Sequence, residues 1–586
     1  MIGIAIANSV GIRRSSGSVV VVPIATAATG VGQTSFTANW NAFAGANYYL
    51  LDVSLNSSFS SFVGSYQNYV VIGTSQLVSG LTPNTTYYYR LRAATGVDSD
   101  AASFFTRVYT AGGTLSYSEV TATETLVYDM KTAGVWTAMK AVYPMIGGSA
   151  ASCAQNLKSS SFTGTFSSGW TFASNGATPN GTSAFMNSGL NASTNLSPTS
   201  LSFGGYTSTT TDATGYSGAT PPNYLMQSWK SYNYTEYWRT TVSSISIAGG
   251  SVGMIQCNQV GTDSRIYRNS TLGTNDINAM VSLPNFNMYI GATNNSGSPT
   301  FYDLHLVSYY YYADGLTPTQ ALNHYTAVQT FNQTLNRSVG PQIVSDADAQ
   351  AYINRVYTAG GTLTNTEASA VNQLVIDMKT AGIWTAMRAV YPMVGASAAA
   401  CAQNLKSSSF TGAFSSGWTF TSNGVQGNGT STYFDTTLNP TGTLSTTSAH
   451  MSFYSRTNIN ESKYDMASNN YSVIVYGNTF YVNLTGSGIF TASYSVANTL
   501  GFYLGARTND TNVNGYRNGT KVIDNAPLIS QIGTQTTLLG ARTTSGGDVS
   551  AKQYAFASIG DGLTDTQAAS LYTAAQAFNT TLSRQV

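Results

Sequence analysis

Residues 107–115 read RVYTAGGTL, and residues 355–363 read RVYTAGGTL again. The similarity continues beyond this stretch, because residues 107–176 and 355–424 share 54 identities in 70 positions. A period of this length indicates tandem domains and excludes a solenoid, whose repeats are about 20–50 residues long. The duplication therefore decides the architecture of most of the chain.

The two copies diverge behind their nearly identical fronts and become similar again at their ends, where Arg337 matches Arg584. Two explanations stay open: a fixed attachment half that carries a variable outward half, or a recent duplication that drifted unevenly. A chain of 586 residues has room for several domains. We expect five segments: an N-terminal arm (1–22), a first β domain (23–106), a first repeat (107–340), a linker (341–354) and a second repeat (355–586).

The composition narrows the class of protein. Charged residues make up only 8% of the chain, compared with about 25% in a typical soluble domain. Hydrophobic residues reach 42%, which is enough to supply a core and argues against a disordered tail. The chain is also rich in tyrosine, with 39 residues, and tyrosine offers contact area and a hydroxyl at low entropic cost. This mixture is typical of extracellular β modules and viral fibres, and it argues against a charged cytosolic enzyme.

Charge and cysteine content exclude further classes. The formal net charge is +1 and no basic run exists beyond Arg13 and Arg14, so we expect no nucleic-acid partner. Three cysteines are too few and odd in number for a disulfide framework, and we expect buried free thiols. Residues 1–12 are apolar, but they lack a basic leading region and are too short to cross a bilayer. We therefore expect neither a signal peptide nor membrane insertion.

Each repeat opens with a predicted helix. In the second repeat Thr366 is the expected N-cap, Glu367 lies in the first turn and Gly382 ends the helix. Ser118 is the corresponding cap in the first repeat. A second short helix is expected at residues 384–390, because a Tyr-Pro pair follows it.

A long β region follows the opening helices. Short apolar runs such as residues 480–484 and 502–504 are separated by Gly, Asn and Asp. Residues 516–522 predict a hairpin, because Asn518 and Gly519 suit the left-handed positions of a type I′ turn. Many short strands with one tight hairpin predict a two-sheet jelly roll.

Each repeat closes with a predicted helix that begins at a capping box. The boxes read TPTQ at residues 317–320 and TDTQ at residues 564–567. We expect the opening and closing helices of a repeat to pack together against the sandwich. The predicted fold class is therefore mainly β: one sandwich followed by two jelly-roll modules, each framed by short helices.

The motifs of the repeats resemble one known family. In the second repeat they are KTAGIW (379–384), YPMVG (391–395), NLK (404–406), GWTF (417–420), NGT (428–430), FASIGDGL (556–563) and QAF (576–578). This succession resembles a module of tail and head-fibre proteins in phages that infect Bacteroidetes, including crAss-like phages. The β part of that module is similar to the concanavalin A-like, laminin-G-like jelly roll. The resemblance covers both repeats.

The first β domain resembles a fibronectin type III domain. The matching stretches are FTANW (36–40), YYLLDV (48–53) and LTPNTTYYYRLR (81–92). Trp40 would be its core tryptophan, and Tyr87 would form the tyrosine corner found in such sandwiches. Domains of this kind serve as spacers, decorations and weak binders, so the fold implies no activity.

The phage resemblance implies a structural protein of the virion surface, a tail or head fibre or a decoration, that is assembled in the host cytoplasm. It implies a homo-oligomer, by resemblance a trimer, with other virion proteins and host surface polysaccharide as partners. We interpret the arm (1–22) as the attachment segment, since backbone with few charges and repeated glycine can join a neighbour's sheet edge. The alternative is an ordered arm that folds against the first domain. No cofactor is expected.

Catalysis is not expected from this sequence. The three histidines, His305, His324 and His450, follow no nucleophile–base–acid order and no metal-ligand spacing. Glycoside cleavage needs a pair of carboxylates. The acidic residues of the β regions are not placed alike in the two copies; they include Asp263, Asp303, Glu461, Asp465 and Asp510.

Sugar or calcium binding is the alternative that the fold allows. Asn509, Asp510, Asn512 and Asn514 form a loop whose oxygens could bind a glycan or Ca²⁺ at a sheet rim. The competing interpretation is an ordinary Asn/Asp-rich turn. Three functions therefore stay open: a virion structural protein, a dedicated receptor-binding lectin-type adhesin and, third, a glycan depolymerase.

Overall fold

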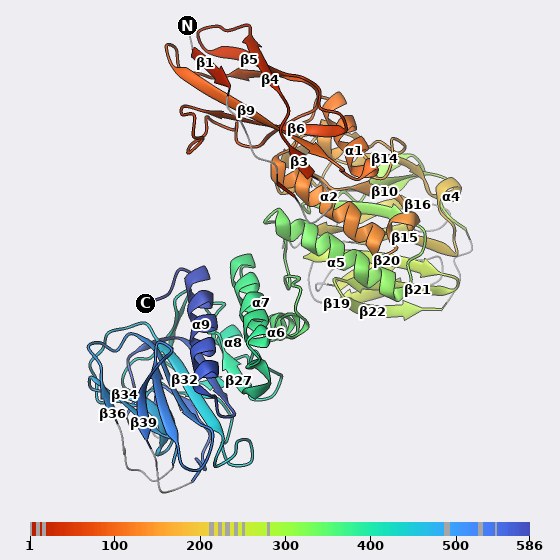
Figure 1. Ribbon diagram of the computed structural model, residues 1–586. Helices are drawn as coiled ribbons and strands as arrows, with labels where there is room; N and C mark the ends of the chain where they lie inside the picture. The colour runs from red at the N-terminus through yellow and green to blue at the C-terminus, as the bar shows by residue number, and fades with distance from the viewer. Residues whose placement is uncertain are drawn as a thin grey trace. The chain divides into compact units, whose positions relative to one another are not determined.

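A computed structural model of the chain is mainly β and divides into two units, residues 1–339 and 340–586 (Figure 1). Unit 1 contains a first domain and one module of the duplication, module 1 (residues 98–339). Unit 2 is module 2 (residues 340–586). The structure describes residues 3–6, 12–13, 19–209, 216–220, 225–228, 235–239, 244–248, 252–277, 282–485, 493–525, 531–544 and 548–586.

The first domain is a sandwich of two sheets. One sheet has the order β4-β5-β8, with strands β4 (Ala25–Thr29), β5 (Ser35–Trp40) and β8 (Ser75–Ser79). The other has the order β2-β3-β9-β6-β7 with β1 beside β9, and its strands are β1 (Gly3–Ile6), β2 (Ile12–Arg13), β3 (Val19–Val21), β6 (Ala46–Ser54), β7 (Tyr69–Val71) and β9 (Thr86–Thr95). Trp40 is buried in the core, and the backbone N–H of Thr82 donates to the Tyr87 hydroxyl at 2.8 Å. The predicted core tryptophan and tyrosine corner are therefore present.

The described part of the N-terminal arm belongs to this sandwich. Strand β1 pairs in parallel with the first half of β9, and β3 pairs antiparallel with its last residues. Strand β6 lies along the other edge of β9. Because the chain leaves β9 directly for a helix, no later strand of this domain pairs with that edge among the described residues. The arm takes the place of a strand that would follow β9.

Helix α1 (Ser99–Thr110) begins in residues 99–106, which were predicted to be the end of the first β domain, and continues into the first repeat. Asp98 caps it by accepting the backbone N–H of Asp100. The helix packs against the first domain, because the ring of Phe105 meets the ring of Tyr48 edge-on. The Tyr48 hydroxyl also donates to Glu124 at 2.7 Å, on the next helix of module 1.

Module 1 places helices on one face of a two-sheet sandwich. Its helices are α1, α2 (Tyr117–Thr132), the 3-10 turn η1 (Trp136–Ala138), α3 (Ala150–Cys153), α4 (Ala192–Asn195) and α5 (Pro318–Thr334). The sheet next to them has the order β10-β26-β15-β20-β21-β22, from β10 (Met139–Tyr143), β26 (Tyr309–Ala313), β15 (Ser200–Thr207), β20 (Gly253–Val260), β21 (Asp263–Arg268) and β22 (Thr271–Asp276). The remaining strands of module 1 lie outside this sheet. They are β11 (Thr165–Phe166), β12 (Trp170–Ala173), β13 (Gly176–Pro179), β14 (Met186–Asn191), β16 (Tyr216–Thr220), β17 (Leu225–Ser228), β18 (Thr235–Arg239), β19 (Ser244–Ala248), β23 (Asn287–Ile290), β24 (Thr293–Asn295) and β25 (Ser298–Thr300).

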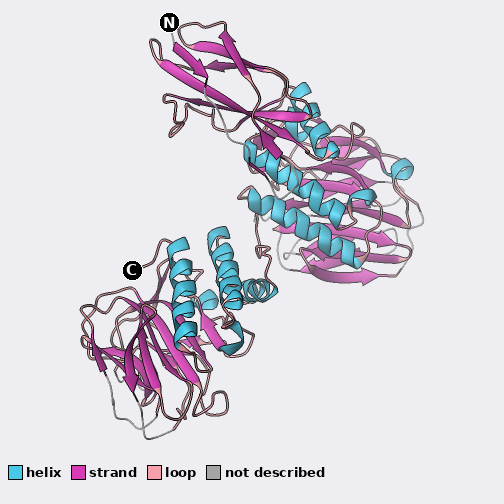
Figure 2. Cartoon of the chain, in the orientation of Figure 1, coloured by secondary structure: helices cyan, strands magenta, loops and turns pink. Residues whose placement is uncertain are grey.

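Module 2 has three layers: helices, an inner sheet and an outer sheet (Figure 2). The helices are α6 (Ala347–Thr358), α7 (Asn365–Thr380), the 3-10 turn η2 (Trp384–Ala386), α8 (Ala398–Cys401) and α9 (Asp565–Thr581). The inner sheet contains β27 (Met387–Tyr391), β29 (Thr419–Thr421), β30 (Gly424–Gln426), β41 (Gln553–Gly560), β32 (Ala449–Ser455), β37 (Gly501–Arg507), β38 (Val513–Arg517) and β39 (Thr520–Asn525). The outer sheet contains β28 (Ala413–Phe414), β31 (Phe434–Asp435), β40 (Leu538–Leu539), β33 (Met466–Ser468), β34 (Tyr471–Tyr476), β35 (Thr479–Asn483) and β36 (Ser493–Ser495).

Two apolar cores hold these layers together. One lies between the helices and the inner sheet and includes Leu374, Phe502 and Phe578. The other lies between the two sheets and includes Phe453 and Val473. Opening helix α7 packs against closing helix α9, and α2 packs against α5 in module 1, as expected from the sequence. The outer sheet therefore turns one face toward the core and the other away from the helices.

Several local predictions are confirmed. Asn518 and Gly519 take positive φ angles of 48° and 76° in the turn between β38 and β39. Capping boxes begin α5 at Thr317 and α9 at Thr564. All three cysteines are free and buried: Cys153, Cys257 and Cys401. In the described part of the chain, no helix is both long and apolar enough to cross a bilayer.

The opening helices begin earlier than predicted. Helix α7 is capped by Thr364, not by Thr366, and α2 is capped by Ser116, not by Ser118. Both caps form full capping boxes with a glutamate three residues later, which fixes the start of the helix. The helix predicted at residues 384–390 is only the turn η2, after which the chain extends into β27. Helix α6 likewise begins inside the segment expected to be a linker.

Candidate functional site

The loop predicted to bind Ca²⁺ or a glycan is an exposed turn in module 2. The side-chain oxygen of Asn509 accepts the backbone N–H groups of Thr511 and Asn512 at 2.9 and 2.7 Å. Asp510 is exposed, whereas Asn514 lies in strand β38, opposite Ala506. The side-chain oxygens of Asn509, Asp510, Asn512 and Asn514 are therefore not arranged around a common site where an ion could bind. Among the described residues, no three His, Cys, Asp or Glu side chains gather closely enough to hold a metal ion.

Two of the histidines are buried hydrogen-bonding groups of the sandwich. His324, on α5, lies 3.1 Å from Gln256 and 2.9 Å from the Tyr309 hydroxyl. Burial lowers the pKa of His324 to about 3. His450, on β32, lies 2.6 Å from the carbonyl of Asp561, and burial lowers its pKa to about 4. Both imidazoles are therefore neutral at physiological pH and tie a strand to its neighbours.

The third histidine belongs to a buried pair in module 1. Nδ1 of His305 lies 2.5 Å from a carboxylate oxygen of Asp303, and both side chains are fully buried. The same carboxylate oxygen accepts the backbone N–H groups of Leu304 and His305. Because both side chains are fully buried, no substrate can reach this Asp–His pair. Its hydrogen bonds stabilise the turn at residues 303–305.

Module 2 has a lysine at the position equivalent to His305. His305 stands 9 residues before Asp314, and Lys552 stands 9 residues before Asp561 in the shared DGLT stretch. The Lys552 ammonium lies 3.0 Å from both carboxylate oxygens of Asp465, and neither side chain is exposed. The sequence alone did not predict this pair, because its two members are 87 residues apart in the chain.

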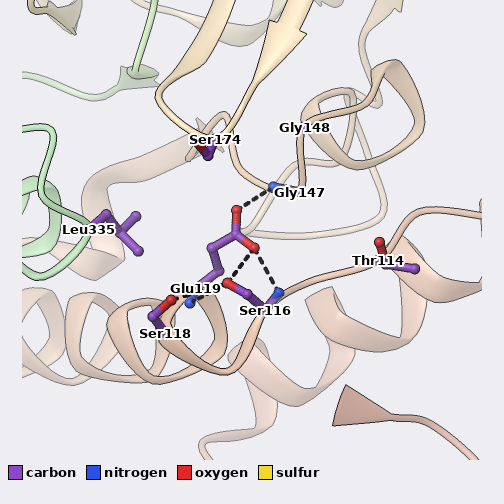
Figure 3. A pocket seen from close by; sticks show the side chains of 8 residues that line it. All are labelled: Thr114, Ser116, Ser118, Glu119, Gly147, Gly148, Ser174 and Leu335. Carbon is purple, nitrogen blue, oxygen red and sulfur yellow. Dashed lines mark hydrogen bonds between the residues drawn. The ribbon is translucent and has the colours of Figure 1, made fainter. Parts of the chain in front are cut away.

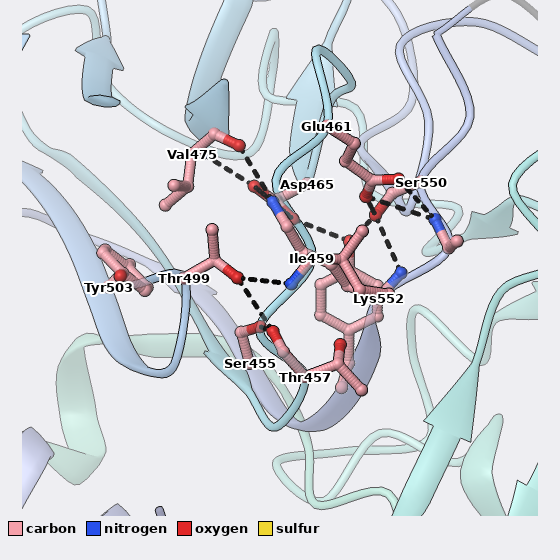
Figure 4. Close-up of polar contacts among 12 residues, drawn as sticks. Ser455, Thr457, Ile459, Glu461, Asp465, Val475, Thr499, Tyr503, Ser550 and Lys552 are labelled. Atoms are coloured by element: carbon pink, nitrogen blue, oxygen red, sulfur yellow. Dashed lines mark hydrogen bonds and ion pairs between the residues drawn. The ribbon is translucent and has the colours of Figure 1, made fainter. Parts of the chain in front are cut away.

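The surroundings of Lys552 satisfy it completely (Figure 4). Its ammonium also donates to the carbonyl of Val475 at 2.9 Å. Asp465 accepts the Tyr554 hydroxyl at 2.8 Å and the Val475 backbone N–H at 2.7 Å. Burial raises the pKa of Tyr554, which keeps this hydroxyl a donor. A buried ion pair with every partner in place fixes the packing of the sandwich and has no group left for chemistry.

A pocket of about 340 Å³ lies where α2 begins in module 1 (Figure 3). Glu119 points into it, but its carboxylate already accepts the N–H and hydroxyl of Ser116 and the N–H of Gly147. In module 2 Glu367 accepts the N–H groups of Thr364 and Gly395 in the same way. Because both copies keep these bonds, the glutamate carboxylate stabilises the start of the opening helix in each module.

A buried arginine closes each module. Arg337 donates to the carbonyls of Pro144, Met145 and Ser308, and Arg584 donates to the carbonyls of Pro392, Met393 and Ala555. Each also donates to an asparagine of the preceding helix. Burial lowers the pKa of both guanidinium groups to about 10, so both remain charged. These bonds tie the end of the closing helix to the start of the module.

Neither a protein-family model nor a curated protein matches the sequence. Among solved structures, domain 4 of the GH43 extracellular arabinanase AbnA from Geobacillus stearothermophilus, in complex with arabinotriose, is 13% identical over 32% of this chain and 98% of its own, with a TM-score of 0.24. The binding domain of botulinum neurotoxin serotype D is 10% identical over 33% of this chain and 52% of its own, with a TM-score of 0.25. The NanB sialidase from Streptococcus pneumoniae is 15% identical over 22% of this chain and 24% of its own, with a TM-score of 0.19. Scores this low define neither a family nor an activity for the chain.

Proposed function

We propose that the chain is a non-enzymatic structural protein of a bacteriophage particle, a tail or head fibre or a decoration. Its modules are displayed on the particle surface and adhere to host surface glycans. The first domain acts as a fibronectin type III-like spacer in this proposal. The assignment to phage is supported by the motif series of the repeats and by a composition that is poor in charge and rich in tyrosine.

One observation supports the adhesive role: the two modules keep the same polar contacts at the start of the opening helix and at the end of the closing helix, whereas the chain diverges between them. Arg337 and Arg584 make matching contacts, and so do Glu119 and Glu367. Inside the sandwich the copies differ even at a fully buried position, where His305 is replaced by Lys552. A scaffold whose frame is fixed while the rest changes is suited to present different surfaces for binding.

Two measurements test this proposal. The purified full chain is applied to a glycan array and to surface polysaccharide from the host, and we expect binding without release of reducing ends. Antibody raised against residues 340–586 is expected to label virions in electron micrographs. Labelled virions without glycan binding would leave a purely structural protein, and glycan binding without labelled virions would favour a dedicated adhesin. Release of reducing ends would favour the depolymerase.

The N-terminal arm has a separate test. In the structure its described strands pair with β9 of the same chain, which is the alternative stated for it from the sequence. As an attachment segment it would need to bind a virion protein with the residues between these strands or after exchange of a strand. Virions that still carry a chain without residues 1–21 would contradict the attachment role.

A further inference from the structure

The outer sheet of module 2 has a face directed away from the helical layer. Along β34 the side chains of Val473 and Val475 enter the core between the sheets. Because side chains alternate along a strand, Ser472, Ile474 and Tyr476 lie on the opposite face. This outward face carries three tyrosines and two further side chains that contact them. We call this group the tyrosine face; its members are Tyr464, Tyr476, Tyr481, Ile474 and Arg542.

The tyrosines of this face touch one another around Ile474. Tyr481 on β35 stands directly opposite Ile474 on β34 and packs against it, together with Tyr464. The rings of Tyr464 and Tyr476 meet edge-on with centroids 6.4 Å apart. Tyr476 has 39% of its surface exposed, so one aromatic ring of the group stands open to solvent. Exposed aromatic rings with polar tips offer flat contact area without a large entropic loss.

Arg542 extends this face along β33. Its guanidinium lies 5.3 Å from the ring centre of Tyr464, and one of its amino groups donates to Asn470 at 2.6 Å. Tyr464 precedes β33 and Asn470 follows it, so the guanidinium contacts residues at both ends of the strand. A carboxylate oxygen of Asp548 lies 3.7 Å from an amino group of Arg542 and balances its positive charge. Among the described residues the Nε of Arg542 has no hydrogen-bond partner.

A polar floor lies beside the tyrosines. Ser472 on β34 and Asn483 on β35 stand directly opposite each other, and both are buried. The hydroxyl oxygen of Ser472 and the side-chain nitrogen of Asn483 have no hydrogen-bond partner among the described residues. Because both side chains are almost completely buried, a ligand at the tyrosine face would meet the tyrosines and Arg542 and would not reach these two atoms.

We infer that the tyrosine face is a binding site for a neutral oligosaccharide. This inference rests on the proposed adhesive function and names its site. The C–H face of a pyranose would stack on Tyr476 and Tyr481, and its hydroxyls would accept hydrogen bonds from Arg542. A neutral sugar fits better than an acidic one, because Asp548 already balances the charge of Arg542.

The test is a titration of the full chain with cellotriose, chitotriose, isomaltotriose and trigalacturonate, followed by saturation-transfer NMR and calorimetry. We expect at least one neutral trisaccharide to bind. Tyr476→Ala and Arg542→Ala should each weaken this binding by about tenfold or more. Tyr476→Phe should retain most of it, because the ring remains. Tyr128→Ala is the matched control, since Tyr128 is 49% exposed on α2 of module 1.

The outcomes separate this site from the proposed function. If the chain binds glycans on the array but Tyr476→Ala and Arg542→Ala bind like the unchanged protein, the site is wrong and the adhesive function stands. Binding of trigalacturonate alone would overturn the neutral specificity. If no glycan binds on the array and no trisaccharide binds in solution, both the site and the adhesive function fail. Circular dichroism of each variant checks that module 2 is folded, and Tyr476→Phe gives a second readout should Tyr476→Ala unfold it.

Discussion

Arg337 and Arg584 are buried arginines that make matching contacts at the ends of the two modules. Arg584 is the last side chain that joins α9 to the rest of module 2, and its donors meet three carbonyls and the side chain of Asn579. A guanidinium suits this position because it presents several donors in one rigid plane. The charge has no buried acid as an ion-pair partner among the described residues, so the carbonyl dipoles stabilise it.

Arg584→Met should destabilise module 2 by about 3 kcal/mol, because several buried carbonyls lose their donor at once. Thermal unfolding measured by calorimetry should show one transition at lower temperature. Arg388→Met is the matched control: Arg388 forms an exposed ion pair with Asp561, and its loss should change stability by less than about 1 kcal/mol. Equal effects of the two substitutions would contradict the role assigned to Arg584.

The buried pair of Lys552 and Asp465 should behave as a unit. Lys552→Met leaves the Asp465 carboxylate in the sandwich without its cation, and we expect a loss of about 3–5 kcal/mol. The double variant Lys552→Met with Asp465→Leu should recover a large part of this loss, because no charge is then buried. Denaturant unfolding of the four proteins gives the coupling energy. Additive losses in the double variant would contradict a coupled pair.

The buried histidines predict a loss of stability in mild acid. An unfolded histidine takes up a proton below about pH 6.5, whereas His450 in the fold does so only near pH 4. The unfolded state therefore binds more protons between these values, and stability falls as pH falls through this window. At pH 5 the loss is about 2 kcal/mol for this residue. His450→Gln should flatten the dependence of the unfolding free energy on pH between 6.5 and 5, and an unchanged slope would contradict the prediction.

At the scale of elements, the sequence correctly predicted the turns and helix starts that depend only on neighbouring residues. The turn at Asn518 and Gly519 and the capping boxes at Thr317 and Thr564 were all identified from neighbouring residues. The starts of the opening helices were misplaced by two residues, since Thr366 and Ser118 are also good caps. Only the reciprocal contacts of the glutamate decide between the candidates.

Helices α1 and α6 were missed for another reason. Their apolar residues recur at helical spacing, for example Ala101, Phe104, Phe105 and Val108, and Asp98 is a suitable cap. The two copies are nearly identical only from residues 107 and 355 onward, so the duplication gave no sign of the helical residues that precede them. The pairing of Lys552 with Asp465 could not be predicted, because it depends on which strands of two sheets face each other.

The N-terminal strands should support the first domain. Strands β1 and β3 cover one edge of β9, and without them the backbone groups of that edge lose their partners. Deleting residues 1–21 should therefore speed amide hydrogen exchange in Thr86–Thr95. Exchange in module 2 should stay the same and serves as the control. Unchanged exchange in β9 would show that these strands add nothing to the sheet.

At the scale of the whole molecule, the division into two units predicts two independent folding reactions. Residues 1–339 and 340–586 each contain their own helices, sheets and apolar cores. Expressed separately, each fragment should unfold cooperatively, and the two calorimetric curves should add up to that of the full chain. Because the tyrosine face lies wholly within module 2, fragment 340–586 should bind the same trisaccharide as the full chain, with similar affinity. Fragment 1–339 lacks the tyrosine face and should not bind this trisaccharide. Equal binding by both fragments would show that the binding site is formed by residues common to the two modules.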